Sequence, residues 1–374
     1  MTKKLALLGS TGSIGRQTLK VMEFHGLAPA VLTGNKNAAL LETQARRFLP
    51  ELVCVADEAA GREVRLKLAD TAVKVEIGRE AILHAAAYEG ADNVLNSLVG
   101  LAGLAPTIAA LDAGKTLLLA NKESLVYGGA LVTAKAPNGI VPVDSEHSAI
   151  FQCLRAGRQG LRRIILTASG GAFLGRSREE LEAVTPEMAL RHPNWSMGAK
   201  VTVDSATLLN KGLEGIEAMH LFGVKIDDIS VVIHRQSIVH SLVEYDDGAM
   251  IAQLGAPDMC LPIQYALFYP ERPACPGPRL DLVKAGTLTF EQPDTEAFPC
   301  LGLAIGAARR GGNACAALCG AGEAAVESFL AGGCSFPGIA ERISRALERV
   351  PFISSPTIED LFETDSLARI VSAE

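Results

Sequence analysis

The chain is poor in aromatic residues and has neither long apolar runs nor paired cysteines. Aromatic residues make up 5% of its 374 positions, with a single tryptophan. No uninterrupted apolar stretch reaches the roughly 18 residues of a membrane span. The apolar run at the start is broken by Gly9, before the about 7–15 residues of a signal peptide core are complete. We therefore expect a soluble, cytoplasmic protein without a membrane partner.

Cysteine usage points the same way. The 8 cysteines are scattered, and none form a CxxC pair. Cys315 and Cys319 are four apart, but no set of His or Cys residues completes a zinc site around them. Reduced and partly buried thiols of a cytosolic protein are expected.

Charge and composition exclude other classes. The net charge is −7 and the pI is near 5.6, which argues against a nucleic-acid-binding surface. With 48% hydrophobic residues and no evident repeats, the chain has material for ordinary buried cores. Its length allows about two to three domains.

Hydrophobic patterning predicts an α/β protein. Strand-like apolar runs alternate with helical stretches at 3–9, 29–35, 52–57, 73–78, 92–100 and 115–121. This alternation is typical of a parallel, doubly wound, Rossmann-like sheet. A strand at 162–173 and a β-rich stretch at 229–255, with an Asp-Asp-Gly hairpin turn, predict a mixed α/β domain next.

The last third of the chain changes character twice. Four prolines between 270 and 278 predict a linker, and beyond Pro299 the chain is Ala-rich and helical. The predicted domains are 1–147 (cofactor binding), 148–270 (catalytic), 271–298 (linker) and 299–374 (C-terminal helical).

A glycine-rich turn follows the first predicted strand. Gly9, Gly12 and Gly15 would let backbone N–H groups approach a pyrophosphate at a helix N-terminus. The spacing is GxxGxxG rather than GxGxxG, and a tight turn without a ligand would use similar residues. At the end of the second strand, 34–37 contains Lys36 and no acid, which favours NADPH over NADH.

Two acidic clusters carry most of the functional information. Asp144 and Glu146 are two apart, which in an extended chain puts both carboxylates on one side. With Glu214 they form an all-oxygen set suited to Mg²⁺ or Mn²⁺. The sequence 121–123 (Asn-Lys-Glu) follows a strand and is either a ligand edge or a plain surface loop.

The second cluster lies on a predicted helix at 206–220, for which Ser205 would be the N-cap. Asn210 and Glu214 are four apart and share a face, with Lys211 beside them. Their donors suit an anion such as phosphate, although a solvated helix face has the same composition.

Other polar residues are less specific. Ser169 ends a strand where backbone donors gather. Trp195 lies in 192–198, either in a mobile lid over a substrate or in an ordinary loop with the indole in the core. His234 and His240 have no matching carboxylates, and we expect structural roles for both.

Taken in order, the motifs GSTGSIG, NKESLV, VPVDSEHSAIFQ, TASGG, HPNWSMG and VDSATLLNKGLE resemble those of the 1-deoxy-D-xylulose 5-phosphate (DXP) reductoisomerase family of isoprenoid biosynthesis. The resemblance spans essentially the whole chain. It implies an NADPH- and divalent-metal-dependent oxidoreductase, with Mg²⁺, Mn²⁺ or Co²⁺, that is a homodimer.

The resemblance also implies residue roles. The residues that it implies as contacts of NADPH are Thr11, Gly12, Ser13, Ile14, Asn35, Lys36, Asn37, Asn121, Glu123 and Gly198. The implied metal ligands are Asp144, Glu146 and Glu214. The reacting end of the substrate would face Lys122, Ser145 and Glu146, and its phosphate end and hydroxyls would face Ser169, His192, Ser205, Asn210 and Lys211. Glu214 is a further implied substrate-binding residue. Catalytic roles would fall to Lys122, Glu146 and His192, while Trp195 and Met197 would belong to a closing loop.

The implied reaction is a retro-aldol cleavage of the phosphorylated sugar, re-addition, and hydride transfer to give 2-C-methyl-D-erythritol 4-phosphate. Glu146, Lys122 or a metal-bound water is the implied proton shuttle. A run of the type Asn-Ala-Ala-Asn-Glu in the family is replaced here by 319–323, Cys-Gly-Ala-Gly-Glu, and Ala172 stands where the family often has Pro. Two rivals stay open: an NADP-dependent dehydrogenase that does not rearrange its substrate, and a nucleotide-binding sensor.

Overall fold

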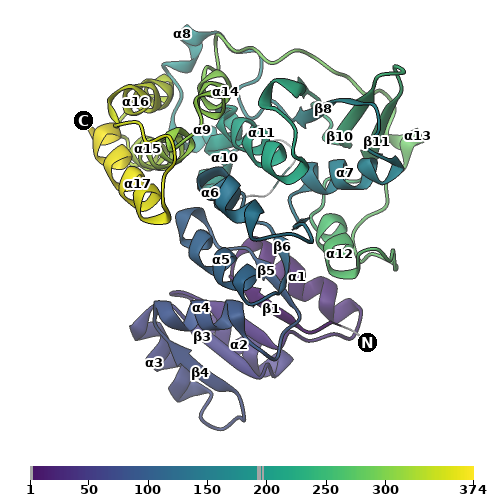
Figure 1. The fold of residues 1–374 in the computed structure, drawn as a ribbon, viewed down its shortest axis with the longest axis vertical. Coiled ribbons are helices and arrows are strands. Elements are labelled where there is room, and N and C mark those ends of the chain that lie inside the picture. Colours follow the sequence, from purple (N-terminus) through teal and green to yellow (C-terminus); the bar gives the residue numbers. More distant parts are fainter. Residues whose placement is uncertain (1–2, 192–194, 196–197) are drawn as a thin grey trace. The chain divides into compact units, whose positions relative to one another are not determined.

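A parallel β-sheet organises the first part of the chain in the computed structural model, which describes residues 3–191, 195 and 198–374 (Figure 1). Its seven strands run in the order β4-β3-β2-β1-β5-β6-β7, and every neighbouring pair is parallel. The strands are β1 (Leu5–Leu8), β2 (Val31–Gly34), β3 (Leu52–Val55), β4 (Lys74–Ile77), β5 (Asn93–Asn96), β6 (Thr116–Leu119) and β7 (Val141–Pro142). The predicted doubly wound, Rossmann-like sheet is confirmed.

Helices connect these strands. They are α1 (Ser13–Phe24), α2 (Ala38–Phe48), α3 (Glu58–Lys67), α4 (Arg79–Ala87), η1 (Gly100–Gly103), α5 (Leu104–Asp112), α6 (Glu123–Ala134) and α7 (Ser145–Cys153). Helix α2 packs against α3 and α4 against α5, while the strand order reverses between β1 and β5. Ligands in such sheets bind outside the carboxyl ends of the strands, at this reversal.

A second sheet has four strands in the order β11-β10-β8-β9. They are β8 (Leu161–Ala168), β9 (Ile229–Ile233), β10 (Val239–Tyr245) and β11 (Met250–Leu254). Strand β10 is antiparallel to β8 and β11, whereas β8 and β9 are parallel. The Asp246-Asp247-Gly248 turn joins β10 to β11, as predicted, so the mixed sheet is confirmed.

Helices accompany this sheet and follow it. Those before residue 270 are η2 (Leu154–Ala156), α8 (Arg178–Leu181), α9 (Pro186–Ala189), α10 (Ala199–Ala206), α11 (Leu209–Phe222), η3 (Ile226–Asp228) and α12 (Cys260–Phe268). Later come α13 (Leu282–Ala285), α14 (Cys300–Arg310), α15 (Ala314–Leu330), α16 (Phe336–Arg349) and α17 (Ile358–Ala373). The C-terminal helical region is thus present as predicted. Over the described residues, no helix combines the length and the apolar character needed to cross a membrane.

Contacts divide the chain into two compact units, each of which is made of segments that are separated in the sequence. The first contains residues up to Ser124, Ala130–Ser148 and Asp258–Pro278; the second contains Leu125–Gly129, Ala149–Pro257 and Arg279–Glu374. Helix α12 joins the first unit because Cys260 and Ile263 belong to its hydrophobic core. Helices α6 and α7 each contribute residues to both units.

One predicted helix boundary is wrong. Ser205 is not the N-cap of a helix at 206–220, because it lies in the last turn of α10, which begins after Gly198. The next helix, α11, begins at Leu209, and its N-cap Leu208 adopts φ 60. A left-handed leucine makes the break, and neither Gly nor Pro marks it in the sequence.

Candidate functional site

The turn from β1 to α1 is shaped by its glycines. Gly9 has φ 84, a conformation that favours glycine, and accepts a backbone hydrogen bond from Gly12 at 3.1 Å. A Cβ on Gly15 would lie 2.3 Å from the Gly9 carbonyl oxygen, so the helix packs directly on the turn. The N-cap Gly12 makes no side-chain cap to α1. The first turn of α1 therefore presents backbone donors suited to a phosphate.

The neighbouring strand ends in an exposed polar segment at the same edge. Asn35, Lys36 and Asn37 are all exposed after Gly34. Asn37 has a second role that the sequence did not reveal, since its Oδ1 accepts from the Leu40 N–H at 3.1 Å and caps α2. Lys36 supplies positive charge where acidic residues in related folds bind a ribose.

The end of β6 is held by a buried amide. Asn121 donates through Nδ2 to the carbonyls of Leu98 and Gly100, at 2.9 and 3.1 Å, and to Glu123 Oε2 at 3.0 Å. Its Oδ1 accepts from the Ser124 N–H. Asn121 is 1% exposed, so its side chain fixes the turn that presents Lys122. The alternative of a plain surface loop is wrong for this segment.

Lys122 pairs with the first acidic cluster. Its Nζ lies 2.6 Å from Asp144 Oδ2, and Asp144 Oδ1 accepts from the Ser145 N–H at 2.8 Å. The Ser145 hydroxyl donates to Glu146 Oε2. The premise of an extended chain is wrong here: Asp144 precedes α7, and Glu146 lies in its first turn. The carboxylates therefore stand at a helix N-terminus, where negative charge is favoured.

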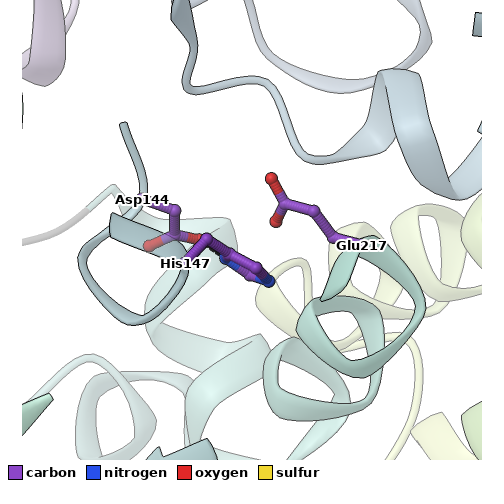
Figure 2. Close-up of side chains that lie close together, drawn as sticks. All are labelled: Asp144, His147 and Glu217. Carbon is purple, nitrogen blue, oxygen red and sulfur yellow. Dashed lines mark ion pairs between the residues drawn. The ribbon is translucent and has the colours of Figure 1, made fainter. Parts of the chain in front are cut away.

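His147 is a residue to which the sequence analysis assigned no role. It is fully buried, and its Nδ1 lies 3.8 Å from Asp144 Oδ2 (Figure 2). Figure 2 also labels Glu217, on α11 in the second unit, which is equally buried. A buried charged residue needs polar partners. A signal was present in the sequence, since Glu217 follows Glu214 by three positions and so lies near the same helix face.

The second cluster, on α11, is buried. Lys211 and Glu214 are 5% and 1% exposed, and Lys211 Nζ lies 2.5 Å from Glu214 Oε2. Asn210 Nδ2 donates to Glu214 Oε1 at 2.5 Å, as expected for residues four apart. The alternative of a solvated helix face is therefore wrong. Such a buried pair is weak evidence for stability, because desolvation of the two charges offsets much of their attraction.

The turn after β8 packs against the end of α10. Ser169 Oγ accepts from the Gly171 N–H at 3.2 Å, and Gly170 and Gly171 have φ 87 and 69. A Cβ on Gly171 would lie 2.6 Å from Ala206 Cα and 2.8 Å from the Ser205 carbonyl oxygen. Ser169 and Ser205, which are 36 positions apart in sequence, are thus carried by two packed segments.

The remaining predicted residues divide between described and undescribed parts. Trp195 is half-buried, and its ring lies 6.2 Å from that of His240, whereas His192 and Met197 lie outside the described residues. His234 accepts at Nε2 from the Ile238 and Val239 N–H groups and contacts the Thr289 carbonyl through Nδ1. This pattern agrees with a structural role. Burial lowers the pKa of His240 to about 4.

A Rossmann-like sheet with a glycine-rich turn suited to phosphate, in a chain that also carries ionic clusters of carboxylates and lysines, is typical of a dinucleotide-dependent oxidoreductase. Sequence models of one family match along the chain: "1-deoxy-D-xylulose 5-phosphate reductoisomerase" at residues 5–129, its C-terminal domain at 140–222, and "DXP reductoisomerase C-terminal domain" at 254–371. The chain belongs to the 1-deoxy-D-xylulose 5-phosphate reductoisomerase family.

Individual relatives agree along the full length. The reductoisomerase of Agathobacter rectalis is 49% identical over 98% of each chain, and that of Phocaeicola vulgatus is 48% identical over 100% of this chain and 98% of its own. A solved DOX-P reductoisomerase in complex with NADPH, fosmidomycin and magnesium superposes with a TM-score of 0.94 at 41% identity, covering 99% of this chain and 97% of that one. The Zymomonas mobilis enzyme in complex with NADPH gives 0.93 at 40% identity, covering 100% and 98%.

Proposed function

We propose that the protein catalyses the NADPH- and divalent-metal-dependent isomerisation and reduction of DXP to 2-C-methyl-D-erythritol 4-phosphate. The observation that carries this proposal is the match to reductoisomerases over 98% of the chain at 49% identity. The chemistry of the chain's own residues supports it, since a phosphate-binding turn, a metal-type carboxylate set and an anion-type donor set are all present.

NADPH would bind at the carboxyl edge of the parallel sheet. The pyrophosphate would contact the backbone of the first turn of α1, and Lys36 would attract the 2′-phosphate. The proposed cofactor-binding residues are Thr11, Gly12, Ser13, Ile14, Asn35, Lys36, Asn37, Asn121, Glu123 and Gly198. Because the side chains of Asn121 and Asn37 are engaged in the turn and in the helix cap, their contacts with the cofactor would use the backbone or a remaining polar atom.

The proposed metal ligands are Asp144, Glu146 and Glu214. Three carboxylates suit a hard cation such as Mg²⁺, Mn²⁺ or Co²⁺. Ile150 of α7 and Ala218 of α11 belong to one hydrophobic core. Glu146 lies one helical turn before Ile150, and Glu214 lies one helical turn before Ala218. This placement supports a shared role of the two carboxylates as metal ligands. When bound, the cation would act as a Lewis acid on the ketone and hydroxyl oxygens of the substrate.

The phosphate end of DXP would be held by hydroxyl, amide and ammonium donors. The proposed set is Ser169, His192, Ser205, Asn210 and Lys211. Support comes from the packing of the Ser169 turn on α10 and from the burial of Lys211, whose desolvated charge would attract an anion strongly. Trp195 and Met197 would close over the substrate and exclude water.

At the reacting end, Lys122, Ser145 and Glu146 would contact the substrate. Lys122 Nζ, within 2.6 Å of Asp144, would stabilise negative charge on a substrate oxygen and orient the carboxylate. Ser145 donates to Glu146, which would fix the orientation of that carboxyl group. Proton transfer falls to Glu146 or Lys122, with His192 as a further catalytic residue.

Two properties of the whole protein complete the proposal. We propose a homodimer, because β11 has β10 as its single neighbour among the described strands and Met250 on this edge is exposed. Sedimentation would then give about twice 39.3 kDa. We also propose a cytoplasmic location, because all 8 cysteines are free thiols, as is usual in a reducing compartment.

The test is NADPH oxidation with DXP, with and without Mg²⁺ or Mn²⁺, followed by analysis of the product. Metal-dependent oxidation that yields the branched polyol phosphate is the expected result. Oxidation that yields an unbranched product would favour the plain dehydrogenase. Binding of NADPH without turnover under any metal would favour the sensor.

A further inference from the structure

Helix α6 begins with residues of the proposed active site and continues into the second unit. Glu123 and Ser124 belong to the first unit and Leu125–Gly129 to the second. Tyr127 lies one turn after Glu123 and is 4% exposed. Its hydroxyl donates to Asp365 Oδ1, on α17, at 2.5 Å. The helix that presents Lys122 is therefore tied to a residue 238 positions away.

The acceptor of this hydrogen bond belongs to a partly buried ionic network. Asp365 Oδ2 accepts from Arg369 Nε at 2.7 Å, and Arg369 also pairs with Glu323 of α15. Both oxygens of Asp365 are therefore engaged, which fixes the carboxylate in one orientation. Burial, followed by the nearby Cys319, Asp365 and Glu323, holds the pKa of Tyr127 well above its ordinary value of 10, so the phenol stays a donor.

The packing of α15 against α17 is adapted to this arrangement. A Cβ on Gly320 would lie 2.7 Å from the Asp365 carbonyl oxygen and 2.8 Å from its Oδ1. Only glycine allows α17 to approach so closely. Gly320 lies in the 319–323 run, where the sequence departs from the pattern expected for the family. The departure thus makes room for Asp365.

Helix α6 needs this hydrogen bond to α17 because the residues directly after Tyr127 have low helix propensity. Gly128 and Gly129 follow, and each glycine in a helix costs about 1 kcal/mol relative to alanine. A Cβ on Gly129 would lie 2.1 Å from Nε2 of His220, so a residue other than glycine cannot stand there without displacing the His220 side chain. The direction of the first turn of α6 is consequently set by tertiary contacts.

We propose that Tyr127 is a positioning residue, which acts through α6 to hold Lys122 and Glu123 in their productive places by its hydrogen bond to Asp365. The proposal rests on the proposed function, since those two residues matter only if they face substrate and cofactor. The C-terminal helices are in this view part of the catalytic apparatus rather than a passive addition.

The experiment compares Tyr127→Phe with Thr364→Val in the full-length protein. Both remove one buried hydroxyl. Thr364 precedes Asp365 on α17, and its hydroxyl accepts a hydrogen bond from Asn313 Nδ2 at 2.9 Å. For Tyr127→Phe we expect kcat to fall about tenfold and the Kd of NADPH to rise several-fold, because small displacements of catalytic groups are costly. For Thr364→Val both should stay within about twofold of wild type, at a similar loss of thermal stability.

Asp365→Ala provides the coupling test. If Tyr127 acts through Asp365, adding Tyr127→Phe to Asp365→Ala should lower kcat no further. Unchanged kcat and NADPH affinity in Tyr127→Phe would overturn the proposal, as would equal kinetic effects of Tyr127→Phe and Thr364→Val. Wild-type turnover of DXP tests the proposed function separately. The Kd of NADPH needs no turnover, so it distinguishes failure of the positioning role from failure of the reaction assignment.

Discussion

Gly171→Ala should separate the geometry of the turn after β8, which carries the proposed substrate ligand Ser169, from the stability of the fold. The new Cβ would lie 2.6 Å from Ala206 Cα, whereas carbon atoms in contact prefer about 3.5–4.0 Å. The end of α10, with Ser205, must therefore move by about 1 Å. The left-handed φ of 69 adds about 1–2 kcal/mol and the overlap about 1–3 kcal/mol, so we expect a loss of about 2–5 kcal/mol in unfolding free energy.

Gly175→Ala is the matched control, four residues further along. Gly175 has φ 87, but a Cβ there meets nothing within 4 Å, so the substitution brings the backbone strain without the overlap. We expect Gly175→Ala to cost about 1–2 kcal/mol and to leave the KM for DXP unchanged. Gly171→Ala should raise this KM about tenfold to a hundredfold, because it displaces by about 1 Å the hydroxyl of Ser205, which we propose to bind the substrate.

Urea denaturation and steady-state kinetics at saturating NADPH check both variants. The Kd of NADPH should be the same for both variants and wild type, because neither glycine is among the proposed cofactor-binding residues. Equal KM values for Gly171→Ala and Gly175→Ala would refute the reasoning, since the contact between the turn and α10 would then have no role in substrate binding.

Three further outcomes follow from the same structure. Asp144→Asn should lower kcat/KM for DXP by about 10²- to 10³-fold while NADPH binding measured by fluorescence stays intact; retention of most activity would favour the plain dehydrogenase. Chelation with EDTA should stop NADPH oxidation until Mg²⁺ is returned, and Mg²⁺ should raise the melting temperature of wild type but not of Glu214→Gln. Burial lowers the pKa of His240 from 6.5 to about 4. Between pH 6.5 and 4 the unfolded chain therefore binds a proton that the folded chain does not. The unfolding free energy should fall as the pH is lowered through this range, and it should fall less steeply in His240→Gln.

Most of the parallel sheet was predictable because its strands are short, continuous apolar runs. Strands β1, β2 and β3 are buried at every position, and Gly, Asn or Asp follows each within a few residues. The end of the apolar run and the turn residue therefore mark the same strand boundary. The break between α10 and α11 had no such marker. Leu208 adopts a left-handed conformation because the surrounding packing imposes it, and propensity rules assign that conformation to glycine.

The residue types of the candidate site were predictable, but their surroundings were not. Spacing of four predicted that Asn210 and Glu214 meet, and they do. It could not predict that Lys211 and Glu214 are buried, because charges at this spacing are usually solvated. The pairing of Lys122 with Asp144 joins the ends of two strands, β6 and β7, that are neighbours only in the folded sheet. Tyr127 and Asp365 are further apart still, and neither belongs to a motif.

The distribution of these residues along the helices has a physical consequence. Lys122 immediately precedes α6, and Asp144 immediately precedes α7. Each helix then contributes residues to the second unit, Leu125–Gly129 from α6 and the residues from Ala149 onward from α7. Groups at the start of a helix move with its axis, so a displacement of the packed part reaches the charged end. If Lys122 and Asp144 have their proposed roles, the core around Ile150 and the hydrogen bond of Tyr127 would act on both residues without touching the substrate. This arrangement predicts that kinetic effects of core substitutions will concentrate on α6 and α7 rather than follow the distance from the substrate.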